Sequence, residues 1–116
     1  MSNYEAGRRF EWLVRDFLRE NGYEVIRAAG SKTKVDLVGI KRGQLLFVQC
    51  KRTSIPGPAE RVQIASLAGM VGALPIVATR GARGTGGPLL RRITGSGENP
   101  KDLERFLIDE VGQDNG

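Results

Sequence analysis

Apolar positions near the start of the chain repeat with the spacing of an amphipathic helix. Five of them follow the i, i+3, i+4, i+7, i+8 pattern of one buried face: Phe10, Leu13, Val14, Phe17 and Leu18. The pair Asn21-Gly22 comes next and is typical of a left-handed helix end. The pattern therefore predicts an N-terminal helix that buries one face and ends at this pair.

The pattern then changes to that of β-strands. Strands are predicted over residues 23–28, 35–40 and 45–51, with a polar loop over 30–34 before the second strand and a short turn at 41–44 before the third. The last two strands are close enough in sequence to form a hairpin.

A helical pattern returns after a break at residues 54–58, where two prolines prevent a continuing strand ladder. Residues 60–74 are apolar nearly all round, which predicts a buried crossover helix. Residues 75–79 form a short apolar segment that is typical of an interior parallel strand. Another strand is predicted over 88–93, after a Gly- and Arg-rich loop at 80–87.

A last helix is predicted near the C-terminus, because Asn99-Pro100 has the form of an N-cap followed by Pro at the first helical position. Its buried stripe would consist of Leu103, Phe106, Leu107 and Val111. The element order α-β-β-β-α-β-(β)-α predicts an α/β fold with a mixed central β-sheet flanked by helices. With 116 residues and no linker, we expect one domain over residues 1–116.

Composition excludes several kinds of site and setting. No apolar run approaches the roughly 18 residues that a bilayer span needs, and residues 1–5 lack the order of a secretory signal, so we expect no membrane association. The single cysteine cannot form an internal disulfide, which favours a cytoplasmic protein, nucleoid-associated or viral in a host cytoplasm. The absence of histidine excludes a His-based triad and a His-containing zinc site.

The net charge of +5 favours polyanions, chiefly nucleic acid, although a soluble protein that is merely basic is the alternative. The candidate DNA contacts are Arg8, Arg9, Ser31, Lys32, Lys34, Arg52, Arg80 and Arg83. The polar loop at Ser31-Lys32 has donors for phosphate, and the segment from Arg80 to Arg83 has the composition of a flexible arm for a DNA backbone. An ordinary solvated loop is the alternative for each.

Hairpin register gathers three polar side chains at one end of the predicted hairpin. A two- or four-residue turn places Asp36 directly across from Gln49, with Lys51 two residues beyond on the same side. A three-residue loop would slip the register by one residue and turn Asp36 to the other face. The structural alternative is a polar hairpin end that only meets water.

This cluster suits phosphodiester hydrolysis assisted by Mg²⁺, with Mn²⁺ able to substitute. A hard cation prefers oxygen ligands, and Asp36, the Gln49 amide and the Cys50 backbone carbonyl each offer one. Lys51 could orient the attacking water or stabilise charge on the transition state. Glu11 flanks the apolar stripe of the first helix and is the best further acid, although a solvated acid is the alternative there. The Cys50 side chain alternates away from this group and is expected in the core.

These features resemble the PD-(D/E)xK nuclease superfamily, and within it the archaeal-type Holliday junction resolvases. The resemblance rests on Glu11 in the first helix, the Gly30-Ser31-Lys32 loop, Asp36 at a strand start, and Gln49-Cys50-Lys51 at the end of the next strand. It implies a restriction-endonuclease-like core, acids that bind a divalent metal, a catalytic lysine, and a homodimer acting on four-way junctions. The chain departs at Gln49, where resolvases usually carry Glu.

The sequence therefore predicts a metal-dependent DNA endonuclease that resolves Holliday junctions as a homodimer. One alternative is a related nuclease acting on flaps, single strands or modified duplex DNA. Another is a non-catalytic DNA-binding module on the same scaffold, with Gln49 marking a degenerate site; the intact Lys51 argues against it. Because a neutral ligand replaces a charged one, we expect looser metal binding, and tighter binding by a Gln49→Glu variant.

Overall fold

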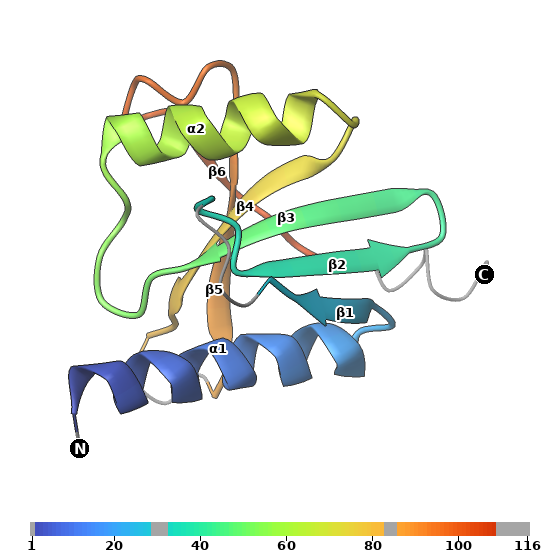
Figure 1. Ribbon diagram of the computed structural model, residues 1–116, viewed down its shortest axis with the longest axis vertical. Helices are drawn as coiled ribbons and strands as arrows, with labels where there is room; N and C mark the ends of the chain where they lie inside the picture. Colours follow the sequence, from blue (N-terminus) through green and yellow to red (C-terminus); the bar gives the residue numbers. More distant parts are fainter. Residues whose placement is uncertain (1, 29–32, 83–85, 109–116) are drawn as a thin grey trace.

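A six-stranded mixed sheet lies between two helices, one on each face (Figure 1). The computed structural model describes residues 2–28, 33–82 and 86–108. The elements in chain order are α1 (Asn3–Glu20), β1 (Glu24–Arg27), β2 (Leu37–Lys41), β3 (Gln44–Cys50), α2 (Pro58–Gly69), β4 (Leu74–Arg80), β5 (Pro88–Ile93) and β6 (Leu103–Arg105). The strands follow one another across the sheet in sequence order. The predicted α/β class is confirmed.

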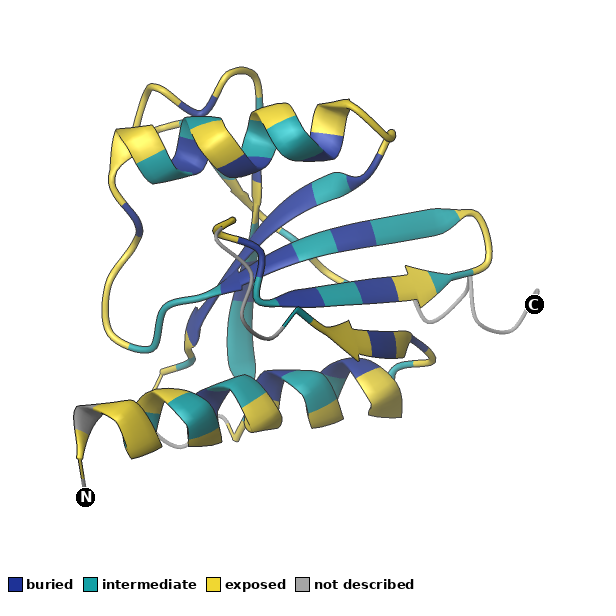
Figure 2. Cartoon of the chain, in the orientation of Figure 1, coloured by how far each residue is buried: buried dark blue, intermediate teal, exposed yellow. Residues whose placement is uncertain are grey.

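Helix α1 covers one face of the sheet, as its apolar stripe predicts. Its start is capped by Ser2, whose hydroxyl accepts a hydrogen bond from the Glu5 N–H (3.1 Å), and it ends at Asn21. Phe10, Val14 and Leu18 are buried in a core shared with the strands, and Phe17 packs against it. The prediction is wrong for Leu13, which is 44% exposed. Figure 2 shows the buried positions of α1 turned toward the strands, with exposed positions on its outer side.

The β2–β3 hairpin has the predicted register. Lys41 pairs with Gln44 and Val38 with Phe47, and the pairing extends to Leu37 opposite Val48. Gly43 occupies the turn with φ of 71°, a left-handed conformation that suits glycine. The side of the hairpin on which each residue lies therefore follows the prediction.

Helix α2 carries the chain across the opposite face, so that β4 can pair with β3 in parallel. Ile64 and Ala68 are fully buried, and Ile64 belongs to a second core cluster with Val77 and Ile93. The helix is shorter than the predicted segment 60–74, and the remaining residues lead into β4, whose parallel placement is confirmed.

The predicted C-terminal helix is wrong, because the chain forms a sixth strand there. Asn99 starts a turn instead of a helix: its carbonyl accepts the Asp102 N–H (2.8 Å) and its side chain accepts the Lys101 N–H (2.9 Å). Leu103 then pairs with Ile93, and the Phe106 N–H donates to Leu90 (2.9 Å). Val111, from the predicted stripe, lies outside the described residues.

Packing explains why a strand replaces the helix. Leu103 packs against the core under α2, whereas Phe106 packs against the core under α1. Side chains three residues apart point to opposite faces in a strand but to the same side of a helix. Leu107, the third member of the stripe, is 70% exposed. The backbone groups of β5 also gain partners from the new strand.

Arg61 anchors the N-terminal turn of α2. It is 4% exposed, and its guanidinium donates to the backbone carbonyls of Pro56 (2.6 Å), Gly97 (2.8 Å) and Glu98 (3.2 Å). These bonds tie the helix start to two loops, and so they fix where the neighbouring residue Glu60 stands.

Among the described residues, no helix is long and apolar enough to cross a membrane.

Arg61→Ala is expected to destabilise the protein by about 2–4 kcal/mol, because it removes a buried charged donor from three carbonyls. Urea unfolding measures this loss. The matched control is Arg42→Ala at the exposed hairpin turn, which should change stability by less than about 0.5 kcal/mol. Equal stability of the two variants would contradict the anchoring role.

Candidate active site

Asp36 lies immediately before β2 and reaches toward the end of β3. Its N–H donates to Val48 (2.8 Å), and its Oδ2 accepts the Cys50 N–H (2.7 Å). Burial raises the pKa of this carboxyl, and the negative charge of Glu11 adds to the effect, while the Cys50 N–H and the positive charges of Lys51 and Arg27 oppose it. Asp36 is therefore a half-buried acid in a setting that disfavours its own charge.

Gln49 is 4% exposed and lies on the face of β3 that α2 covers. Its Nε2 donates to Glu60 Oε2 at 2.7 Å. Its Oε1 is buried, and no described residue gives it a hydrogen bond. A carboxylate accepts but cannot donate, so the contact with Glu60 fixes which end of the amide faces the helix. The unpartnered oxygen is left to face elsewhere.

Lys51 follows β3 directly, and its N–H continues the pairing with β4 by donating to Ala78 (2.9 Å). Its Nζ lies 3.5 Å from Glu60 Oε2, the same oxygen that Gln49 contacts. Cys50, between them, packs against the α1 core as predicted. Burial raises the pKa of its thiol well above the usual value, which argues against a nucleophilic cysteine.

Glu11 approaches from α1, on the other face of the sheet. Its Oε1 accepts a hydrogen bond from Arg27 Nε at 2.7 Å, and its side chain is 18% exposed. Its charge contributes to the raised pKa of Asp36, so the two carboxylates are close enough to interact. The structure thus brings Glu11, Asp36, Gln49 and Lys51 to one end of the hairpin.

Two residues of this cluster were not predicted. Glu60 sits in the first turn of α2, where an acid is favoured by the helix dipole in any protein, so its position carries no specific signal. Arg27 is the last residue of β1, and its place in the sequence indicates only an ordinary strand residue. Only the three-dimensional path of the chain shows that they contact Gln49, Lys51 and Glu11.

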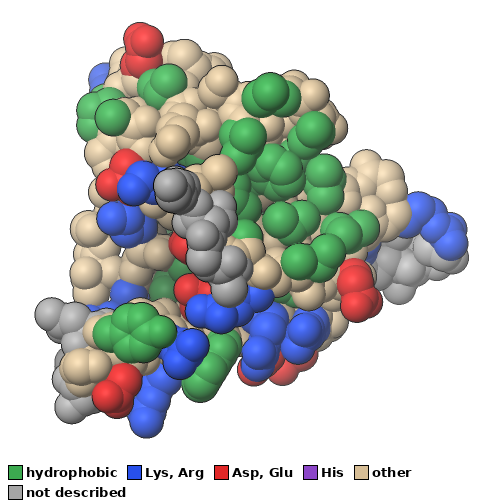
Figure 3. All heavy atoms as spheres, viewed as in Figure 1, with side chains coloured by type: hydrophobic (Ala, Val, Ile, Leu, Met, Phe, Trp, Pro, Cys, Tyr) green, Lys and Arg blue, Asp and Glu red, His purple; other side chains and the backbone are tan. Residues whose placement is uncertain are grey.

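The predicted DNA-contacting residues are more scattered. Arg52 and Arg80 are adjacent, since the Arg80 N–H donates to the Arg52 carbonyl (3.1 Å) where β3 and β4 end. Lys34 is exposed and close enough to lower the pKa of Glu60. Figure 3 shows basic side chains beside acidic ones on the face between the two helices. Ser31, Lys32 and Arg83 lie outside the described residues.

Arg8 and Arg9 lie on α1, close in sequence to Glu11. The Arg8 guanidinium is stacked against two aromatic rings, 5.3 Å from the centroid of Tyr4 and 5.7 Å from that of Trp12. Arg9 is exposed. Neither has a described hydrogen bond to the acidic cluster. Their predicted role as DNA contacts would therefore be exerted beside the cluster and not within it.

The donor set of the cluster fits a hard divalent cation. Within the described part of the chain, no group of three or more His, Cys, Asp or Glu side chains is placed to hold a metal. The oxygens present are instead mixed: carboxylates of Asp36 and Glu11, the amide oxygen of Gln49 and the predicted Cys50 carbonyl. The buried, unpartnered Gln49 Oε1 is the observation that supports this fit.

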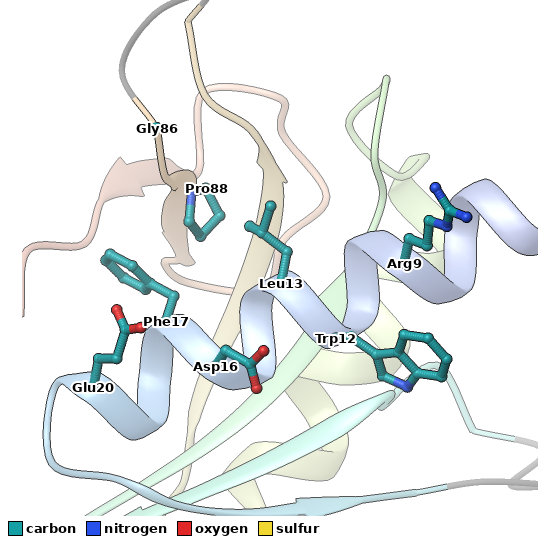
Figure 4. Close-up of a pocket in the computed structure, with 8 residues that line it drawn as sticks. All are labelled: Arg9, Trp12, Leu13, Asp16, Phe17, Glu20, Gly86 and Pro88. Carbon is teal, nitrogen blue, oxygen red and sulfur yellow. The ribbon is translucent and has the colours of Figure 1, made fainter.

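A separate cavity of about 390 Å³ lies between α1 and the start of β5. Figure 4 shows Trp12, Leu13 and Phe17 of the helix lining it together with Pro88 at the start of β5. It includes none of the clustered residues Glu11, Asp36, Gln49 and Lys51. The clustered residues therefore lie at the end of the hairpin and outside this cavity.

The mixed sheet, the crossover helix and the acid–amide–lysine arrangement define a member of the PD-(D/E)xK superfamily. A family model described as archaeal Holliday junction resolvase (Hjc) matches residues 2–85. The chain belongs to this Hjc family.

Two relatives illustrate the likeness. A protein of Methanocaldococcus jannaschii named crossover junction endodeoxyribonuclease Hjc is 41% identical over 51 residues, which is 44% of this chain and 38% of that protein. The chain thus matches well under half of that relative's length. The solved structure of Hjc from the archaeal hyperthermophile Archaeoglobus fulgidus, named a Holliday junction resolvase, superposes with a TM-score of 0.60 at 27% identity. That superposition covers 75% of this chain and 70% of the other.

Asp36→Asn is expected to raise the melting temperature of the metal-free protein by a few degrees near neutral pH. The change removes a half-buried charge and its repulsion with Glu11, while an amide oxygen can still accept the Cys50 N–H. Thermal unfolding in a chelator measures the difference.

The pH dependence gives the control. Folding raises the pKa of Asp36, so the native carboxyl keeps its proton at pH values where the unfolded one has lost it. Wild-type stability therefore falls as pH rises from the unfolded pKa through the higher folded pKa. The advantage of the Asn variant should therefore shrink as pH is lowered toward the ordinary Asp value of 3.8. A variant less stable than wild type at neutral pH would contradict this account.

Proposed function

We propose that this protein is a metal-dependent DNA endonuclease that resolves four-way junctions. The observation that carries the proposal is the convergence of Asp36, the unpartnered Gln49 Oε1 and Lys51 at one hairpin end. The relatives named Hjc support the junction as substrate. We also propose that residues 1–116 act as one nuclease domain in a cytoplasm, where a lone thiol stays reduced.

Each clustered residue has a distinct proposed task. Asp36, Glu11, the Gln49 amide oxygen and the Cys50 carbonyl would hold the cation, which when bound polarises the scissile phosphate and lowers the pKa of a water. Lys51 places a positive charge beside that phosphate and stabilises the charge that develops on it. Arg27 holds the Glu11 carboxylate near Asp36. Glu11 would exchange part of this contact for the metal.

Membership of the Hjc family implies a divalent metal. We propose Mg²⁺ as the ion, with Mn²⁺ as a substitute, because every ligand is a hard oxygen donor. Arg52, Arg80 and Lys34 are proposed to contact the DNA backbone. Further proposed contacts, on the sequence alone, are Arg8, Arg9, Ser31, Lys32 and Arg83. Such contacts favour recognition of DNA shape over base sequence.

We propose a homodimer, assembled through the part of the sheet that α2 leaves uncovered. Helix α2 contacts β3 and β4, while the same face of β1 and β2 carries the exposed side chains of Ile26 (54%) and Ile40 (41%). Partly buried Val38 and Phe47 lie beside them by register. Figure 3 shows a hydrophobic patch on this face. Contiguous apolar surface marks interfaces, and paired cuts across a junction need two sites related by symmetry.

The activity is tested by incubating the protein with Mg²⁺ or Mn²⁺ and labelled four-way junction, flap, single-stranded and linear duplex DNA. Paired symmetric nicks confined to the junction are expected, and Asp36→Asn should lower the rate at least about 100-fold. Cutting of another form alone would reassign the substrate. Binding with no cutting under either metal would leave a DNA-binding module and contradict the enzyme.

Ile40→Glu tests the interface. A charge in the apolar patch is expected to convert the dimer to a monomer, which light scattering coupled to gel filtration measures, and to replace paired nicks by single ones. Leu107→Glu, at a site 70% exposed beyond β6, is the control and should leave the mass unchanged. A dimer that survives Ile40→Glu would place the interface elsewhere.

A further inference from the structure

We propose that Glu60 is a positioning residue, which holds the Gln49 amide with its oxygen turned toward the metal site and keeps Lys51 beside it. The inference rests on the proposed function, because it concerns how that site is assembled. It explains how Gln49 can serve as a metal ligand at a position where resolvases usually carry a carboxylate. Nothing in the position of Glu60 along the sequence distinguishes it from an ordinary helix residue.

A flip of the Gln49 amide that exchanges its oxygen and nitrogen would cost free energy. The side chain is 4% exposed, and its Nε2 donates to Glu60 Oε2 at 2.7 Å. The opposite orientation would place Oε1 against the carboxylate, which offers only acceptors. Hydrogen bonds to a charged group contribute about 1.5–3 kcal/mol, so the carboxylate holds one orientation firmly. The amide oxygen is thereby kept away from the Glu60 carboxylate.

Glu60 is itself held in place. It follows the helix start at Pro58, and the next residue, Arg61, is fastened to three backbone carbonyls. The hydrogen bond from Gln49 lowers the pKa of Glu60, and the charges of Lys51 and Lys34 add to this effect. A carboxylate on an anchored helical turn suits a positioning role.

The same carboxylate oxygen also faces Lys51. Glu60 Oε2 lies 3.5 Å from the lysine Nζ, while it accepts the bond from Gln49. The Lys51 side chain is 37% exposed, so this ion pair adds little stability. Its effect is geometric, since it draws the ammonium group to the α2 side of the hairpin end, next to the Gln49 side chain.

This arrangement changes what a Gln49→Glu variant should do. On sequence grounds a charged ligand was expected to bind metal more tightly. In the structure that carboxylate would contact Glu60, so the two negative charges would repel each other. A double variant that combines Gln49→Glu with Glu60→Gln restores an acid–amide pair and its hydrogen bond. In this variant the negative charge lies on β3 instead of α2. We therefore expect the double exchange, and not the single change, to match or exceed wild-type metal affinity.

Mn²⁺ affinity in the absence of DNA, measured by calorimetry or by the spin resonance of free Mn²⁺, gives a readout independent of cutting. Glu60→Ala is expected to weaken Mn²⁺ binding about tenfold, as loss of a partner behind a metal ligand commonly does. In a Gln49→Ala background the same change should have no further effect, because Glu60 acts through Gln49. Gln63→Ala, exposed on the same helix, is the matched control and should bind as wild type does.

Three results would overturn the proposal. Wild-type affinity in Glu60→Ala would show that Glu60 has no role at the site. An equal loss with and without Gln49 would show that Glu60 contacts the metal directly. A Gln49→Glu variant tighter than the double exchange would show that the two positions do not interact.

The failure of this inference can be told apart from the failure of the proposed function. If the wild-type protein binds Mn²⁺ and cuts junctions, and the Glu60 variants have unchanged Mn²⁺ affinity, only the positioning role is contradicted. A wild-type protein that neither binds Mn²⁺ nor cuts DNA would sink both. Circular dichroism melts of every variant establish that a lost affinity does not reflect unfolding.

Discussion

The antiparallel pairing of β2 with β3 is the constraint on which the candidate site depends. With Leu37 opposite Val48, Asp36 falls beside the end of β3, next to Gln49 and Lys51. A slip of one residue would turn the whole strand over and separate them. The register is held by burial on both faces, since Leu37 packs under α1 whereas Val38 packs under α2. The packing that stabilises the fold therefore also selects the geometry of the site.

The site contains polar groups that the fold accommodates poorly. The carboxyl of Asp36 has a raised pKa because of burial, and the Gln49 Oε1 is buried without a described partner. A buried acceptor without a hydrogen bond costs about 1–3 kcal/mol. Groups that are unfavourable in the native state and clustered at one point are characteristic of functional sites, because a ligand relieves the cost on binding. Here a cation would satisfy both.

Much of the fold could be predicted because its signals are local. The apolar stripe of α1, the hairpin register and the parallel strand β4 each follow from spacing within a short segment. The C-terminal strand could not, because Leu103 and Phe106 have a spacing that suits a helix, and only the free edge of β5 and two separate cores favour the strand. Glu60 was missed for a related reason: its contact depends on the path of the whole crossover.

The two helices bring acids to the hairpin end from opposite faces of the sheet, each paired with a base. Glu11 comes from the α1 side with Arg27, and Glu60 from the α2 side with Lys51. With Asp36 between them, three carboxylates lie near Arg27 and Lys51, and Lys34 lies close to Glu60, so acidic and basic side chains balance although position 49 is neutral. An amide at that position therefore does not by itself indicate a degenerate site, because the charge that is missing from the strand is present one contact away on the crossover helix.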